Sequence, residues 1–107
     1  MFIKYFQRIR YMQLLSIKKS DKSNKKMMAV FYNPKTNRTN TIHFGAAGMS
    51  DYTIHKDPER RKRYIARHCK NENWKDPATA GALSRFILWE KTSLSAGISA
   101  YKKRFKL

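Results

Sequence analysis

Three side chains in the segment 43–69 have the types and spacing that hydrolytic chemistry uses. Asp51, His55 and Glu59 follow one another at intervals of four residues. Carboxylates bind divalent cations and an imidazole transfers protons near neutral pH, so this set would suit a metal-dependent nuclease whose basic surface holds the substrate. The whole sequence has only 7 Asp and Glu residues, however, and several of them are expected to have structural roles. Too few carboxylates then remain for a two-metal cluster, and we predict that the protein is not an enzyme and has no catalytic residues.

The same segment contains the soft metal donors of the chain. Structural zinc sites use pairs of ligands at short spacing, such as CxxC or HxxxH. Here His43, His55 and His68 are separated by 12 and 13 residues, and Cys69 is the single cysteine. His68 and Cys69 are more simply explained as core or boundary residues on the apolar side of a helix. We therefore predict no metal site and no cofactor.

Two glycines open the segment. Gly45 and Gly48 follow a predicted strand, but neither GxGxxG nor GxxxxGK[ST] surrounds them. A backbone nest for one phosphate is the alternative, because consecutive N–H groups in such a turn can face an anion. We interpret the pair as a turn that ends a hairpin, where a positive φ is needed.

Clustered cations are the most informative feature of the sequence. A helix predicted over residues 58–70 carries Arg60, Arg63, Arg67 and Lys70 at spacings of 3, 4 and 3 along one side. Further clusters occupy residues 18–26 and 102–106. No base-reading motif accompanies them, so we expect contacts with phosphates that do not depend on nucleic acid sequence. The C-terminal cluster is expected to extend the track of cations on the helix. The residues expected to bind the polyanion are Arg60, Arg61, Arg63, Arg67, Lys70, Lys102, Lys103 and Arg104.

The residues before this helix predict a small antiparallel sheet. Apolar runs at 11–17, 27–32 and 41–44 have the length of strands, and the NPKTNRTN stretch joins the last two into a hairpin over 27–44. The first strand is expected to pair with this hairpin as a third strand. One face of that first strand is predicted to consist of Tyr11, Gln13, Leu15 and Ile17.

Three helices are predicted to follow the sheet, over about 58–70, 77–90 and 93–105. Asp57-Pro58 and Asp76-Pro77 each combine an N-cap residue with a proline at the first helical position. The TSLS stretch at 92–95 caps the last helix. The predicted fold is therefore α+β, with residues 12–107 as a single small domain and residues 1–11 as an N-terminal extension or arm.

Composition points to an anionic partner. The 107 residues include 24 Lys and Arg against 7 Asp and Glu, which gives a net charge of +17 and a pI of about 10.4. Such a chain attracts polyanions, with nucleic acid first, an anionic membrane surface second and an acidic protein third. One cysteine excludes an internal disulfide. No apolar run reaches the ~20 residues of a membrane span and the N-terminus lacks the pattern of a signal peptide, so we expect a soluble, intracellular protein.

Three stretches of the chain carry a resemblance to a known family. FGAAGMSDYTIHKDPERRKRYIARH is followed by NENWKDPATAGALSRFILW and then by a short basic helix ending in YKKRF. This order of motifs, over about residues 12–106, resembles a family of small uncharacterised basic proteins of nucleocytoplasmic large DNA viruses, the giant viruses of algae and amoebae. The resemblance implies a viral origin, a place in the virion, and presence in the host cytoplasm or nucleus during infection. It implies no catalytic residues.

Two functions from different classes follow from these observations. The first is a non-enzymatic basic virion protein that binds nucleic acid phosphates, DNA foremost, or another polyanion. The alternative is a minor capsid or cement protein that bridges acidic surfaces of capsid proteins. Cross-linking in intact particles separates the two, because a cement protein would contact capsid proteins and not DNA.

Overall fold

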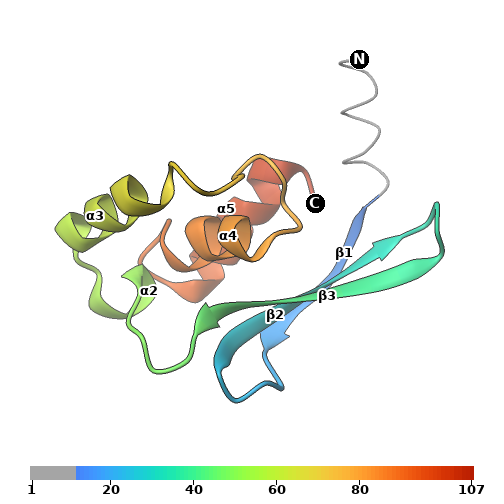
Figure 1. The fold of residues 1–107 in the computed structure, drawn as a ribbon, viewed down its shortest axis with the longest axis horizontal. Coiled ribbons are helices and arrows are strands. Elements are labelled where there is room, and N and C mark those ends of the chain that lie inside the picture. The colour runs from blue at the N-terminus through green and yellow to red at the C-terminus, as the bar shows by residue number, and fades with distance from the viewer. Residues whose placement is uncertain (1–11) are drawn as a thin grey trace.

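The structure, a computed structural model, describes residues 12–107 and shows a three-stranded antiparallel sheet followed by four helices (Figure 1). The strands β1 (Gln13–Lys19), β2 (Lys25–Asn33) and β3 (Arg38–Ala46) lie in the order β1–β2–β3. The helices are α2 (Tyr52–His55), α3 (Pro58–His68), α4 (Ala80–Leu83) continuing as the π-helix η1 (Ser84–Leu88), and α5 (Leu94–Phe105). The predicted α+β fold is confirmed. The expected arm, residues 1–11, lies outside the described residues.

β1 differs from the prediction in the residues that it turns toward the core. An irregularity in the pairing of β1 with β2 falls between Leu14 and Ser16, so that Leu15 is an extra residue in the strand. Such a bulge breaks the alternation of side chains between the two faces. Leu14 and Ile17 pack against the core, whereas Leu15 is 55% exposed. The predicted face is therefore wrong for Gln13 and Leu15, and Tyr11 lies outside the described residues.

The β2–β3 hairpin is confirmed and is longer than predicted, because the pairing continues from Asn33↔Arg38 to Lys25↔Ala46. Its turn is organised by asparagines. The Lys35 amide donates to the Asn33 side chain at 3.0 Å, and Asn37 adopts a φ of 55°. Asparagine tolerates this left-handed conformation and bonds its own backbone, which explains the composition of the turn. In Figure 1 the turn lies at the end of the sheet farthest from α3.

Two of the three predicted helices begin where the capping residues place them. The Asp57 side chain accepts a hydrogen bond from the Glu59 amide at 3.0 Å, and Pro58 is the first residue of α3. The Ser93 hydroxyl accepts from the Ala96 amide at the start of α5. Both helices therefore depend on a local side-chain cap that the sequence shows directly.

The other predicted helix, 77–90, begins three residues later than expected and ends two residues earlier. Asp76 accepts a hydrogen bond from the Ala78 amide at 3.0 Å, but Thr79 then adopts an extended conformation with φ −129° and ψ 150°. The Thr79 hydroxyl accepts from the Ala82 amide and caps α4. The prediction of Asp76 as the helix cap is wrong, because two neighbouring residues compete for the role and the second one starts the helix.

The core lies between one face of the sheet and the helices. Its buried members are Ala29, Phe31, Phe44, Ala82, Leu83, Phe86, Ile87, Leu88, Tyr101 and Phe105. The Tyr101 hydroxyl is satisfied inside this core, since it donates to the Pro77 carbonyl oxygen at 2.5 Å. Burial, assisted by the negative charge of Asp76, raises the pKa of Tyr101.

Gly97 allows α5 to approach η1 closely. A Cβ atom at this position would lie 2.1 Å from the Ile87 carbonyl oxygen, which belongs to the backbone and cannot rotate away. Gly97→Ala is therefore expected to lower the free energy of unfolding by about 1–3 kcal/mol, the usual cost of forcing atoms into a packed interior. Urea denaturation measures the change.

The control for this substitution lies on the exposed side of the same helix. Ser99→Ala is expected to change stability by less than about 0.5 kcal/mol. Helix propensity alone would make Gly97→Ala stabilising by about 1 kcal/mol. A gain in stability would thus contradict the close approach.

Candidate polyanion-binding surface

α3 has one buried side, which fixes the direction of its exposed side. Tyr64 is buried, and its ring stacks on Trp89 with centroids 4.1 Å apart and an interplanar angle of 3°. His68 stacks on Tyr64 with a centroid distance of 4.2 Å. Burial, assisted by the negative charge of Glu72, raises the pKa of Tyr64 to about 12. The neutral Tyr64 thus holds α3 against the end of η1.

The exposed side of α3 and the residues after it carry cations. Arg60, Arg63, Arg67 and Lys70 are all exposed, as is Lys62 beside them. None of these five has a carboxylate within ion-pair distance in the described part of the chain. We call the four residues with spacing 3, 4 and 3, Arg60, Arg63, Arg67 and Lys70, the α3 row.

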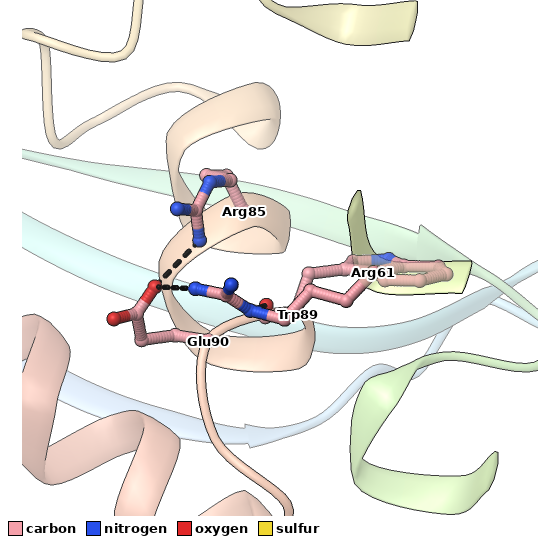
Figure 2. Close-up of polar contacts among 4 residues, drawn as sticks. All are labelled: Arg61, Arg85, Trp89 and Glu90. Carbon is pink, nitrogen blue, oxygen red and sulfur yellow. Dashed lines mark hydrogen bonds and ion pairs between the residues drawn. The ribbon is translucent and has the colours of Figure 1, made fainter. Parts of the chain in front are cut away.

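Arg61 is separated from its neighbours by its orientation. Figure 2 shows its side chain directed to the chain segment that follows η1. Its Nε donates to the Trp89 carbonyl oxygen at 2.8 Å, and its terminal nitrogen donates to Glu90 Oε1 at 3.0 Å. Arg85 donates to the same Glu90 oxygen at 2.6 Å. Arg61 was predicted to bind the polyanion, but in the structure its guanidinium contacts Glu90 and the Trp89 carbonyl oxygen within the fold.

Glu90 is the counterion that makes this arrangement stable. Burial by itself would raise the pKa of Glu90, but the hydrogen bond and charge of Arg85, followed by those of Arg61, outweigh burial and lower the pKa from 4.5. A charge-assisted contact of this kind ties α3 to the segment after η1. The helical spacing in the sequence indicated that Arg61 points inward. Arg61 is three residues before Tyr64 and seven before His68, so the three share the inward side of the helix.

Most of the other carboxylates are also in contacts within the fold. Asp51 is 2% exposed, lies 2.5 Å from the Lys26 ammonium and accepts hydrogen bonds from the amide and hydroxyl of Thr53. Asp57 and Asp76 accept backbone hydrogen bonds near the starts of α3 and α4. The acids therefore neutralise cations or cap turns inside the molecule, and none of them lies within ion-pair distance of the α3 row in the described part of the chain.

A cleft of about 380 Å³ lies between α3 and the sheet. Arg67 lines it from α3, and Lys25 lines it from the start of β2. The two carboxylates in its lining already have partners, because Asp51 pairs with Lys26 and Glu72 lies 3.6 Å from His68. Arg67 and Lys25 are thus the cations in the lining that have no carboxylate partner among residues 12–107.

Lys25 also belongs to a more open hollow at the turn between β1 and β2. This hollow is lined by Lys19, Lys22, Lys25 and Lys26, with Ser20, Ser23 and one carboxylate, that of Asp21, beside them. Because Lys25 lines both spaces, the structure brings the lysines of the β1–β2 turn next to the α3 row. The sequence showed these lysines as a cluster, but nothing in it indicated that they border the cleft beside Arg67.

The C-terminal cluster lies elsewhere. Lys102, Lys103 and Arg104 are exposed at the end of α5, and the Arg104 guanidinium lies over the Phe86 ring, 4.1 Å from its centroid. Figure 1 shows the C-terminal end of α5 and the β1–β2 turn at opposite edges of the molecule, with α3 at a third edge. The C-terminal cations therefore do not extend the α3 row in this structure.

The three residues considered for nuclease chemistry are not brought together. Asp51 is buried against Lys26, and Glu59 is exposed on the first turn of α3. His55 Nδ1 accepts a hydrogen bond from the Asp57 amide at 3.0 Å, and its ring packs on Trp89 at 5.2 Å. Within residues 12–107 no group of three or more His, Cys, Asp and Glu side chains could hold a metal ion.

Other predictions for the segment 43–69 have mixed outcomes. Gly45 and Gly48 have φ values of 78° and 84°, so the prediction of positive φ is confirmed. A Cβ at Gly45 would also lie 2.7 Å from a methyl group of Leu88, which explains why the sheet approaches η1 at a glycine. Cys69 is exposed, and its predicted place on the apolar side of the helix is wrong, because α3 ends at His68 and the chain then turns.

A contact between Ser20 and His43 was not predicted. The Ser20 hydroxyl lies 2.7 Å from His43 Nδ1, and Asp21 Oδ1 lies 4.0 Å from His43 Nε2. The order of groups resembles a Ser-His-Asp set, but the Asp21 side chain is 77% exposed and beyond hydrogen-bond distance. Ser20 also accepts a hydrogen bond from the Lys22 amide. The contact therefore shapes the β1–β2 turn.

Comparison with known proteins gives one family. Residues 15–68, half of the chain, match the model of a family of unknown function (DUF5754). The match covers the sheet from within β1 onward and the whole of α2 and α3. Comparison with curated proteins and with solved structures gives no match. In the described part of the chain no helix is long and apolar enough to span a bilayer. By the extent of this match, the chain belongs to the family of unknown function DUF5754.

Proposed function

We propose that this protein is a non-enzymatic, virion-associated viral protein that binds nucleic acid phosphates without sequence specificity, through the α3 row and the adjoining lysines of the β1–β2 turn. The observation that carries the proposal is the exposed α3 row, which has no carboxylate partner in residues 12–107. Like charges this close repel one another, and a polyanion relieves the repulsion. Duplex DNA is the partner that we expect first.

The spacing of the row suits a nucleic acid strand. Arg60 and Arg67 are seven residues apart on a helix, which corresponds to about 10 Å along its axis. One strand of a duplex carries a phosphate about every 3.4 Å along its axis, so the row spans about three phosphates. Guanidinium groups form paired hydrogen bonds with phosphate oxygens more readily than ammonium groups do. Arg60, Arg63 and Arg67 are therefore the residues with the largest expected contribution.

The viral and virion part of the proposal has a different support. It rests on the resemblance of the FGAAGMSDYTIHKDPERRKRYIARH and NENWKDPATAGALSRFILW stretches to basic proteins of large DNA viruses. Both stretches form the walls of the cleft and the interface between α3 and η1. Detection of the protein in purified particles by mass spectrometry tests this part by itself.

Replacing the three arginines tests the binding surface. Arg60→Gln, Arg63→Gln and Arg67→Gln together keep helix propensity and remove three charges. Each phosphate contact contributes about −0.9 to the slope of log K against log salt concentration. One contact therefore raises the binding constant about fivefold when the salt concentration is lowered from about 1 M to about 0.15 M. We expect the triple variant to bind a labelled duplex about 100-fold more weakly at 0.15 M salt and with a slope smaller by about 2.7, measured by fluorescence anisotropy.

A matched control removes the same charge from other places. Arg38→Gln, Lys56→Gln and Lys91→Gln alter exposed residues outside the α3 row and outside the cluster 18–26, and should leave most of the affinity intact. Equal losses in the two variants would show that net charge alone binds DNA, and the proposed surface would be wrong. Affinity that hardly changes between low and moderate salt, or that differs widely between two unrelated duplex sequences, would defeat the proposed function itself.

A further inference from the structure

The C-terminal end of α5 forms a second basic surface with its own geometry. Tyr101 and Phe105 are buried, which turns the residues between them outward. Lys102 and Lys103 are exposed and have no carboxylate partner among residues 12–107, and Arg104 lies over Phe86. The last 17 residues, from Lys91 to Leu107, contain no Asp or Glu at all. We call Lys102, Lys103 and Arg104 the α5 end.

Stabilisation of the helix alone does not account for this surface. Cations in the last turn of a helix interact favourably with its dipole, by about 0.3–1 kcal/mol each. An excess of positive charge destabilises the folded state through self-repulsion, which opposes this gain as more cations accumulate. An anionic partner would remove this repulsion. The α5 end therefore has the same chemical preference as the α3 row.

A straight duplex seated on both the α3 row and the β1–β2 turn does not reach the α5 end. The molecule measures about 40 × 31 × 24 Å, and Figure 1 shows the α5 end at the edge opposite the β1–β2 turn. DNA is stiff over about 150 base pairs, and bending a site of 20–30 base pairs by 40–90° costs about 1–6 kcal/mol. A duplex that occupies both the α3 row and the β1–β2 turn thus leaves the α5 end unoccupied.

We infer that one molecule bridges two DNA duplexes, one on the α3 row with the β1–β2 turn and the other on the α5 end. The inference rests on the proposed function, since it requires binding of the first duplex. The expected consequence is that the protein draws DNA segments together. A monomer suffices for this, because both surfaces belong to the same chain.

A capture experiment tests the inference on the full-length chain. Beads carrying one duplex are mixed with a second, fluorescent duplex and the protein, and the fluorescence retained on the beads is measured. Lys102→Gln with Lys103→Gln should lower capture about 25-fold at 0.15 M salt, because two phosphate contacts of about fivefold each are lost. Because the α3 row is unchanged, the same variant should still bind a single duplex with a steep dependence on salt. Arg38→Gln with Lys91→Gln removes equal charge elsewhere and should leave capture intact.

The outcomes separate this inference from the proposed function. If the protein does not bind a single duplex, the proposed function is wrong. If the protein binds one duplex with a steep salt slope but captures no second duplex, the bridging inference alone is wrong. Unchanged capture by the Lys102→Gln/Lys103→Gln variant would also contradict bridging, because it would point to association between protein molecules. Beads coated with poly-glutamate in place of DNA provide a further arm. Retention of the DNA-bound protein on these beads but not on duplex beads would overturn bridging of DNA in favour of an acidic protein partner.

Discussion

Lys26→Met is expected to lower the free energy of unfolding by about 3–5 kcal/mol, the cost of leaving a buried charge without its partner. The Asp51 side chain is 3% exposed and lies 2.5 Å from the Lys26 ammonium. Methionine preserves most of the apolar stem of lysine, so the main change is the loss of the positive charge. Urea denaturation at neutral pH measures the effect, which is large for a domain whose whole stability is about 5–15 kcal/mol.

A double-mutant cycle distinguishes loss of the ion pair from loss of packing. Asp51→Asn keeps an N-cap for α2, since asparagine also accepts a hydrogen bond from the Thr53 amide. In the double variant no unpaired charge is left at this site, and we expect it to recover most of the stability lost in Lys26→Met. Lys25→Met, one residue away and without a carboxylate partner in the described chain, should cost less than about 0.5 kcal/mol. Simple addition of the two single effects would contradict the pairing.

Glu90→Gln is expected to lower the free energy of unfolding by about 1.5–3 kcal/mol at pH 7, the range for hydrogen bonds to charged groups. The substitution leaves Arg61 and Arg85 close to each other without the carboxylate that both contact at 3.0 and 2.6 Å. The folded state lowers the pKa of Glu90 from 4.5, so the carboxylate contributes stability above that pH. The contribution is lost as the pH falls through the lower, folded-state pKa. The difference between the unaltered protein and Glu90→Gln should therefore shrink as the pH falls below about 4.5.

Glu59 provides the control for this pH dependence. It is exposed in the first turn of α3, where the helix dipole favours its charge and where it forms no ion pair with another of residues 12–107. Glu59→Gln should cost at most about 1 kcal/mol at pH 7. A stability difference for Glu90→Gln that stays constant from pH 7 to pH 3 would mean that the two arginines do not depend on the Glu90 charge.

These two ion clusters bear on function through the charge that they leave outside. Asp51 and Glu90 neutralise cations at the packing interfaces, at Lys26 and at the pair Arg61 and Arg85. The carboxylates are few, so the α3 row and the α5 end have none to pair with in the described chain. The same contacts that stabilise the fold therefore concentrate the excess positive charge on its surface.

Local signals in the sequence predicted the fold well. Asp57 followed by Pro58 predicted the start of α3, because a cap depends only on residues a few positions apart. The two apolar runs on either side of the asparagine turn predicted the hairpin for the same reason. Asp76 failed as a cap because Thr79 competes with it, and the face of β1 was wrong because nothing in the sequence marks Leu15 as a bulge.

The sequence by itself determined the excess of positive charge, the α+β order of elements and the outward row of Arg60, Arg63 and Arg67. Only the tertiary structure decided that Arg61 pairs with Glu90, that Lys25 and Arg67 line the same cleft, and that the α5 end and the β1–β2 turn lie at opposite edges. The physical reason is distance along the chain. Capping and helical periodicity act between residues a few positions apart, whereas Arg61 and Glu90 are 29 positions apart and Lys26 and Asp51 are 25 apart. Which cations remain exposed to a polyanion depends on those long-range pairs.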